Sequence, residues 1–174
     1  MSLEPLLNAS PIIQIHALAG MAAFVVGGVT LFLPKGNDRH RALGRAWVAL
    51  MVTVAASSFL IWEIRMLGPF SPIHLVSVFT LYALYKGVGH ARAGRIGAHR
   101  RTMQSLYVVA LAVTGIFTLA PGRIMNQVVF GAGGGPSLGG LMVAGALVLA
   151  AGGWLILKPR RRRAGAVTRG LTKP

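Results

Sequence analysis

The sequence predicts an all-α fold, a polytopic transmembrane helix bundle with a four-helix core plus a fifth helix. Two observations predict it. Hydrophobic residues make up 54% of the 174 residues and charged residues only 12%, against roughly 25% charged residues in a soluble domain. The lysines and arginines also cluster between apolar runs that are long enough to cross a bilayer.

Five apolar segments divide the chain, and each is near the length of about 20 residues that crosses a hydrocarbon core. Within lipid, every backbone N–H and C=O has to bond inside its own segment, so each segment is expected to be a helix. No basic stretch precedes the first segment, which predicts a retained helix and not a cleaved signal peptide. The predicted spans cover about residues 11–33, 46–64, 72–89, 103–120 and 138–157.

The four-helix core carries most of the polar residues of the predicted spans. The fifth helix is rich in glycine and alanine, and small residues let helices approach closely, so it predicts a docking surface for a membrane-protein partner. The parts of the chain are an outer N-terminal segment (1–10), the four-helix membrane core (11–125), a glycine-rich outer loop (126–137), the fifth membrane helix (138–157) and a basic cytoplasmic tail (158–174).

The basic residues orient these helices. Sixteen of the eighteen lysines and arginines fall within 35–45, 86–101 and 158–173, and the other two, Arg65 and Arg123, stand alone. Basic loops stay in the cytoplasm, so the N-terminus is predicted to lie outside and the C-terminus inside. Because the sequence shows no organelle signal, the predicted location is a bacterial inner membrane.

The net charge of +15 does not indicate a nucleic-acid binder. The cations flank apolar runs instead of lining a polar surface, and only Glu4, Asp38 and Glu63 are acidic. The predicted partners are the lipid bilayer and anionic lipids at the cytoplasmic face. The lack of cysteine excludes disulfides, thiolate metal sites, iron–sulfur clusters and c-type haem attachment. No nucleophile–base pair is visible, so the sequence leaves open whether the protein is an enzyme.

Two of the histidines, His16 and His74, are expected near the outer ends of the first and third helices. Spacings of 4, 3 and 4 put His16 on one helical stripe with Gly20, Ala23 and Gly27. Such a stripe could form a flat trough in which the His16 Nε2 atom binds the iron of haem b. The alternative interpretation is that the glycines let another helix approach.

A second hypothesis for the outer side is a divalent metal site formed by His16, Glu63 and His74. Two imidazoles and a carboxylate, with water as the fourth ligand, suit zinc. The alternative is that Glu63 forms an ion pair with Arg65 or Arg123 at the membrane interface.

The other three histidines are expected at the cytoplasmic edge, among arginines. Arginine binds two oxygens at once, so the mixture suits haem propionates, quinone head groups or lipid phosphates, whereas positive-inside anchoring explains the arginines alone. One geometric argument opposes a two-haem design: His74 and His90 are sixteen residues apart on one helix, so they point about 160° apart. The cofactor-binding candidates are His16, His40, His74, His90, His99, Arg41, Arg45 and Arg123.

Short polar and glycine-containing motifs recur through the first four predicted helices: Ile15-His16-Ala17-x-Ala19-Gly20, Lys35-Gly36, His40-Arg41-x-x-Gly44-Arg45, Ile73-His74-x-x-Ser77, Ala91-Arg92-x-Gly94, His99-x-x-x-Met103 and Phe117-Thr118-x-x-Pro121-Gly122-Arg123. Together they resemble a widespread family of predicted bacterial membrane proteins of unknown function. The resemblance covers roughly residues 11–125 and implies a topology and a set of polar residues, but no reaction. More distantly, the chain is similar to four-helix di-haem b-type cytochromes, which place histidine ligands near both faces.

Three functions remain open on this basis. The first is a haem-binding or redox-linked membrane protein with histidine ligands near both faces. The second is a metal-handling protein or small-solute transporter that uses His16, Glu63 and His74. The third is a non-enzymatic membrane subunit or assembly factor that docks through its fifth helix.

Overall fold

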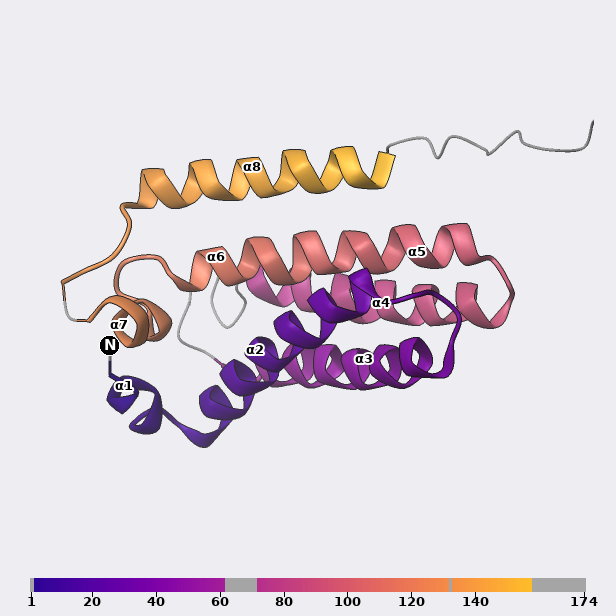
Figure 1. Ribbon diagram of the computed structural model, residues 1–174. Coiled ribbons are helices and arrows are strands. Elements are labelled where there is room, and N and C mark those ends of the chain that lie inside the picture. The colour runs from indigo at the N-terminus through magenta and orange to yellow at the C-terminus, as the bar shows by residue number, and fades with distance from the viewer. Residues whose placement is uncertain (1, 62–71, 132, 158–174) are drawn as a thin grey trace, which may run out of the picture.

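Helices form the fold in the residues that the computed structural model describes, which are 2–61, 72–131 and 133–157 (Figure 1). The all-α class is confirmed for this part of the chain. In chain order the elements are α1 (Glu4–Leu7), α2 (Pro11–Phe32), α3 (Asp38–Ser58), α4 (Pro72–Arg92), α5 (Ile96–Ser105), the π-helix η1 (Leu106–Val113), α6 (Thr114–Thr118), α7 (Ile124–Phe130) and α8 (Leu138–Leu157).

The bundle is built from α2, α3, α4 and one long rod in which α5, η1 and α6 follow one another without a break. The middle of this rod has the wider turns of a π-helix, a rare form in proteins. α3 packs against α2 and α4, and the α5–η1–α6 rod packs against the same two helices. α2 therefore lies diagonally opposite α4, and α3 lies diagonally opposite the rod. α8 lies along the rod (Figure 1).

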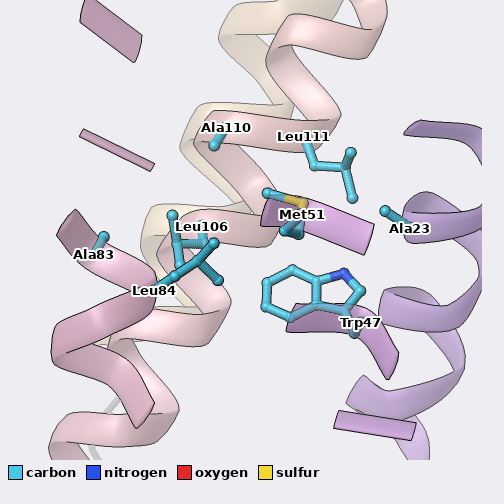
Figure 2. Close-up of a cluster of buried hydrophobic side chains, with 8 residues drawn as sticks. All are labelled: Ala23, Trp47, Met51, Ala83, Leu84, Leu106, Ala110 and Leu111. Carbon is cyan, nitrogen blue, oxygen red and sulfur yellow. The ribbon is translucent and has the colours of Figure 1, made fainter. Parts of the chain in front are cut away.

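Apolar side chains from α2, α3, α4 and η1 fill the centre of the bundle (Figure 2). Met51 and Leu106 are the largest side chains that are fully buried. Three alanines in the same cluster leave room for Trp47, which is 5% exposed. The cluster consists of Ala23, Trp47, Met51, Ala83, Leu84, Leu106, Ala110 and Leu111.

The two ends of the bundle differ (Figure 1). At the end that we call the capped end, α1 packs against α7 and buries Leu6 and Val128. Asn126 of α7 is also buried there, and its side chain donates to Leu119 O at 2.7 Å. Part of the segment predicted as a glycine-rich loop is thus helical, because its apolar residues pack on α1. The opposite end, which we call the loop end, holds the turns between α2 and α3 and between α4 and α5.

Large apolar side chains also cover the outside of the bundle. Phe32, Leu75 and Leu147 are 91%, 74% and 64% exposed. Such a surface is unfavourable in water and suits lipid.

The described residues contain fewer helices that could cross a membrane than the predicted topology requires. By length and composition, Pro11–Phe32 is the one helix of the described residues that could cross a membrane, and Leu138–Trp154 is apolar but shorter. α3 begins with several charged residues, and the second predicted span, 46–64, runs beyond the described residues. The polytopic, five-span topology therefore stays a prediction.

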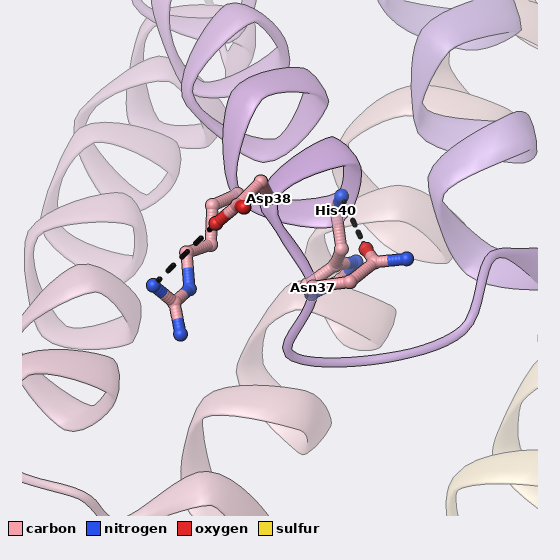
Figure 3. A network of polar contacts seen from close by, with 4 residues as sticks. Asn37, Asp38 and His40 are labelled. Atoms are coloured by element: carbon pink, nitrogen blue, oxygen red, sulfur yellow. Dashed lines mark hydrogen bonds and ion pairs between the residues drawn. The ribbon is translucent and has the colours of Figure 1, made fainter.

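Asn37 sets the start of α3 (Figure 3). Its Oδ1 atom accepts a hydrogen bond from the backbone N–H of His40 at 2.8 Å, which satisfies one of the free donors of the first turn. We expect Asn37→Ala to lower the free energy of unfolding by about 1 kcal/mol. Chemical unfolding of the purified protein in mild detergent measures this loss. Asn37→Asp keeps the capping oxygen and should be nearly as stable as the wild type; a loss equal to that of alanine would contradict the role of the cap.

Candidate histidine sites at the two ends of the bundle

His16 lies in the second turn of α2, at the capped end, and its ring is held by α3. The His16 Nδ1 atom is 2.9 Å from Ser57 Oγ. The Ser57 hydroxyl already donates its proton to carbonyls of its own helix, Thr53 O at 2.7 Å and Val54 O at 3.1 Å. These contacts suit Nδ1–H of His16 as the donor to Ser57 Oγ. A neutral imidazole with its proton on Nδ1 has its lone pair on Nε2, which is the form that binds a metal.

A buried polar row continues from this bond across α3 to α4. Ser58 Oγ and Ser77 Oγ are 2.5 Å apart. His74 lies one turn before Ser77 on α4, is 6% exposed and stacks on Phe59 with ring centroids 5.8 Å apart. The end of α3 therefore contacts both His16 and His74, and the row joins three helices of the bundle.

The stripe of small residues on α2 is open in one half only. The nearest side chain to a Cβ built at Gly20 would be 4.0 Å away. Ala23 is fully buried, and Trp47 and Tyr107 cover Gly27 so closely that a Cβ there would overlap the indole. The prediction of a flat trough is wrong for the Gly27 half, because this half packs against α3 and η1.

His99 lies in the first turn of α5 and is bonded to α4. Its Nδ1 atom is 2.8 Å from Gly87 O. A carbonyl oxygen can only accept, so His99 Nδ1 carries a proton, and Nε2 is the ring nitrogen that is left for another partner. His99 and His16 thus both use Nδ1 for a hydrogen bond to the protein.

His40 belongs to the same end of the bundle as His99. The ring is half-buried, and its Nδ1 atom is buried with no hydrogen-bond partner among the described residues. Burial lowers the pKa of His40, and the charges of Lys35 and His99 lower it further. Burial also lowers the pKa of Lys35, with a smaller effect from Arg100. These four groups therefore lie close enough to influence one another, and His40 favours its neutral form.

His90 has a hydrogen-bond partner of a different kind from that of His99, and it lies on a different face of α4 from His74. α4 runs unbroken from Pro72 to Arg92, so the angle of about 160° between His74 and His90 holds in the structure. The His90 Nδ1 atom accepts a hydrogen bond from Arg95 Nε at 3.2 Å. His90 is thus bonded to the turn that follows α4.

Two of the three candidate arginines contact groups other than the histidines. Arg41 is exposed, and its guanidinium is 3.8 Å from the Asp38 carboxylate. Arg45 is exposed. Arg123, just before α7, places its guanidinium 5.0 Å from the ring centroid of Phe117 at the capped end.

The proposed metal site is incomplete in the described part of the chain, because Glu63 lies outside it. No three histidine, aspartate or glutamate side chains come together there in a group that could hold a metal ion. His16 and His74 are present at one end of the bundle, and α3 touches both.

A family model described as "predicted membrane protein (DUF2306)" matches residues 13–131, which is more than half of the chain. The chain belongs to this family. The family consists of predicted membrane proteins of unknown function, so the chain is assigned as a membrane protein. No curated protein and no solved structure matches the chain. The match runs from α2 to the end of α7, so the region shared by the DUF2306 family contains all five histidines and leaves α8 outside.

The site residues predicted from the sequence of this DUF2306 protein did not include Ser57 and Ser58, which bond to His16 and to Ser77. Ser57 and Ser58 interrupt an apolar run, and Ser77 follows His74 at a spacing of three, which puts both on one face of α4. That spacing is a signal from which the polar row could have been predicted. The π-helix has no comparable signal, because its eight residues read as an ordinary apolar run.

Proposed function

We propose that this protein is a polytopic, redox-linked membrane protein whose bundle binds haem b at both ends. His16 and His74 would hold the haem at the capped end, and His40 and His99 would hold the haem at the loop end. The observation that carries the proposal is the hydrogen bonding of two imidazole rings, those of His16 and His99. In His16 and in His99, Nδ1 is hydrogen-bonded to the protein, which leaves Nε2 as the nitrogen that could bind an iron.

The pairing follows the diagonals of the bundle. α2 and α4 occupy one diagonal, and α3 and the α5–η1–α6 rod occupy the other. Each helix then contributes a single ligand. The angle between His74 and His90 no longer opposes a two-haem design, because His90 is not needed as a ligand.

The charges at the loop end also suit haem. Lys35 acts electrostatically on His40, Arg100 acts on Lys35, and cations of this kind pair with propionates. The lowered pKa of His40 favours the neutral imidazole, which is the form that acts as a ligand. At the capped end, Arg123 is a cation that could take the same role.

Haem b at these positions would supply one-electron transfer. The chain's own residues would set the ring orientations, through Ser57 for His16 and through the Gly87 carbonyl for His99. The buried layer around Met51 and Leu106 lies between the two ends and keeps water out of the bundle (Figure 2). The function that fits this arrangement is electron transfer from one face of the membrane to the other.

An absorption spectrum tests the proposal. The full chain is expressed with ample haem, purified in mild detergent and measured before and after reduction with dithionite. We expect a Soret band and the sharp α band of a haem b with two histidine ligands. A correctly folded protein with no Soret band would reject the proposal.

The proposed topology has the N-terminus outside the inner membrane and the C-terminus in the cytoplasm, because the basic loops stay inside. A reporter fused after Pro174 is expected to report a cytoplasmic location, and one inserted at Gly133 an outer location. Paired enzyme reporters that are active on opposite sides of the membrane measure this. The reverse pair of results would contradict the proposed orientation.

A further inference from the structure

A groove of about 560 Å³ lies between α3 and α4 toward the loop end. One part of its lining is apolar and includes Val48, Val52 and Leu81. Val52 is 42% exposed, so this wall is accessible from outside the bundle. The other part is a cationic rim, which consists of Lys86, Arg92 and Arg95.

The apolar wall and the cationic rim are separated along α4. Leu81 and Arg92 are eleven residues apart, which corresponds to about 16 Å along a helix. Val48 and Val52 of α3 line the same groove beside Leu81. The groove therefore suits an elongated amphiphile with an anionic group at one end and a hydrocarbon chain at the other.

No acidic side chain of the described residues forms an ion pair with this rim. Asp38, the acidic residue at the loop end, lies next to Arg41, and Glu4 is at the capped end. Arg95 Nε donates to His90 Nδ1, and Lys86 Nζ is 5.9 Å from the centroid of the Tyr82 ring. Neither contact offsets positive charge with negative charge. An anion from outside the chain would stabilise the rim by neutralising its mutual repulsion.

We propose that this groove binds one acidic phospholipid. Its phosphate pairs with the cationic rim, and one acyl chain lies along Val48, Val52 and Leu81. A neutral ligand would leave the rim without a counter-charge, and a small soluble anion would leave the apolar wall uncovered. The proposal goes beyond haem binding and does not depend on it, because the proposed haem ligands take no part in the wall or the rim.

Lipid binding to the full chain in a neutral detergent tests the rim. Native mass spectrometry measures the affinity for dioleoyl phosphatidylglycerol, with zwitterionic dioleoyl phosphatidylcholine, which has no net charge, as the comparison. Removing two cations with the Arg92→Gln/Arg95→Gln double variant should weaken binding of phosphatidylglycerol by about thirtyfold. Both arginines are exposed, so the variant should fold. Arg41→Gln removes an exposed cation outside the groove and is the matched control, for which we expect less than about a twofold change.

A second variant tests the apolar wall. Val52→Trp fills the groove and leaves the rim unchanged, so it should weaken phosphatidylglycerol binding, and inorganic phosphate should not displace the lipid. Four results would overturn the proposal: equal affinity for phosphatidylcholine, an equal loss in Arg41→Gln, an unchanged affinity in either groove variant, or displacement by inorganic phosphate. The last result would indicate a site for a soluble anion.

Discussion

His99→Leu is expected to remove the haem at the loop end and to lower the Soret absorbance of the purified protein by about half. Leucine fills a similar space but has no nitrogen to bind iron. The bond from His99 Nδ1 to Gly87 O, which orients the ring, is lost at the same time. His16→Leu should remove the other half, and the double variant should lack the band. Absorbance per chain in mild detergent measures each effect.

His90→Leu is the matched control for this series. It removes a histidine from the same end of the bundle, but this ring is bonded to Arg95 and lies on a different face of α4 from His74. We expect the full Soret absorbance to remain. A loss in His90→Leu together with a normal spectrum in His99→Leu would contradict the assignment and would make His90 the ligand.

Gly27→Ala is expected to destabilise the protein by about 1–3 kcal/mol, the usual range for overpacking a core. A Cβ at this position would overlap Trp47 Nε1 and would lie 2.8 Å from Tyr107 Cδ2. Both neighbours are large aromatic side chains, and Trp47 is buried in the central cluster, so it has little room to move. The midpoint of thermal unfolding in detergent should fall by several degrees.

Gly20→Ala is the control for this effect, because it adds the same methyl group to the same helix, where the nearest side chain is 4.0 Å away. Its midpoint should stay close to that of the wild type. Trp47→Leu should reduce the cost of Gly27→Ala, since it removes the indole that the methyl group meets. If Gly27→Ala is as stable as Gly20→Ala, the close packing of α2 on α3 and η1 is contradicted.

The helical class could be predicted from composition and run length, because a long apolar segment without internal charge has few other ways to satisfy its backbone. The ends of the elements were harder to predict. α3 begins at Asp38, before the apolar run, because the Asn37 cap and the acidic first turn favour a helix there. α1 and α7 form against each other, and a contact between helices so distant in the sequence is not encoded in any local pattern.

The sequence predicted which residues belong to the candidate site. It did not predict which of their side chains lie close together. Positive-inside charge sorted the histidines into two groups, and the structure has the same groups at opposite ends. It brings His40 near His99, which lie on diagonally opposite helices, whereas His90 is bonded to Arg95. The hydrogen bonds of His16 Nδ1 and His99 Nδ1 go to residues that are distant in the sequence, so they could not be read from spacing.

Haem content per chain is the most direct test of a bundle that binds haem through histidine pairs at both ends. The pyridine haemochrome of the purified wild-type protein, divided by its protein concentration, gives this ratio. After expression with ample haem, we predict about two haem b groups per chain, and about one in His16→Leu or His99→Leu. Wild-type protein that is folded and monodisperse but contains no haem would contradict the proposal.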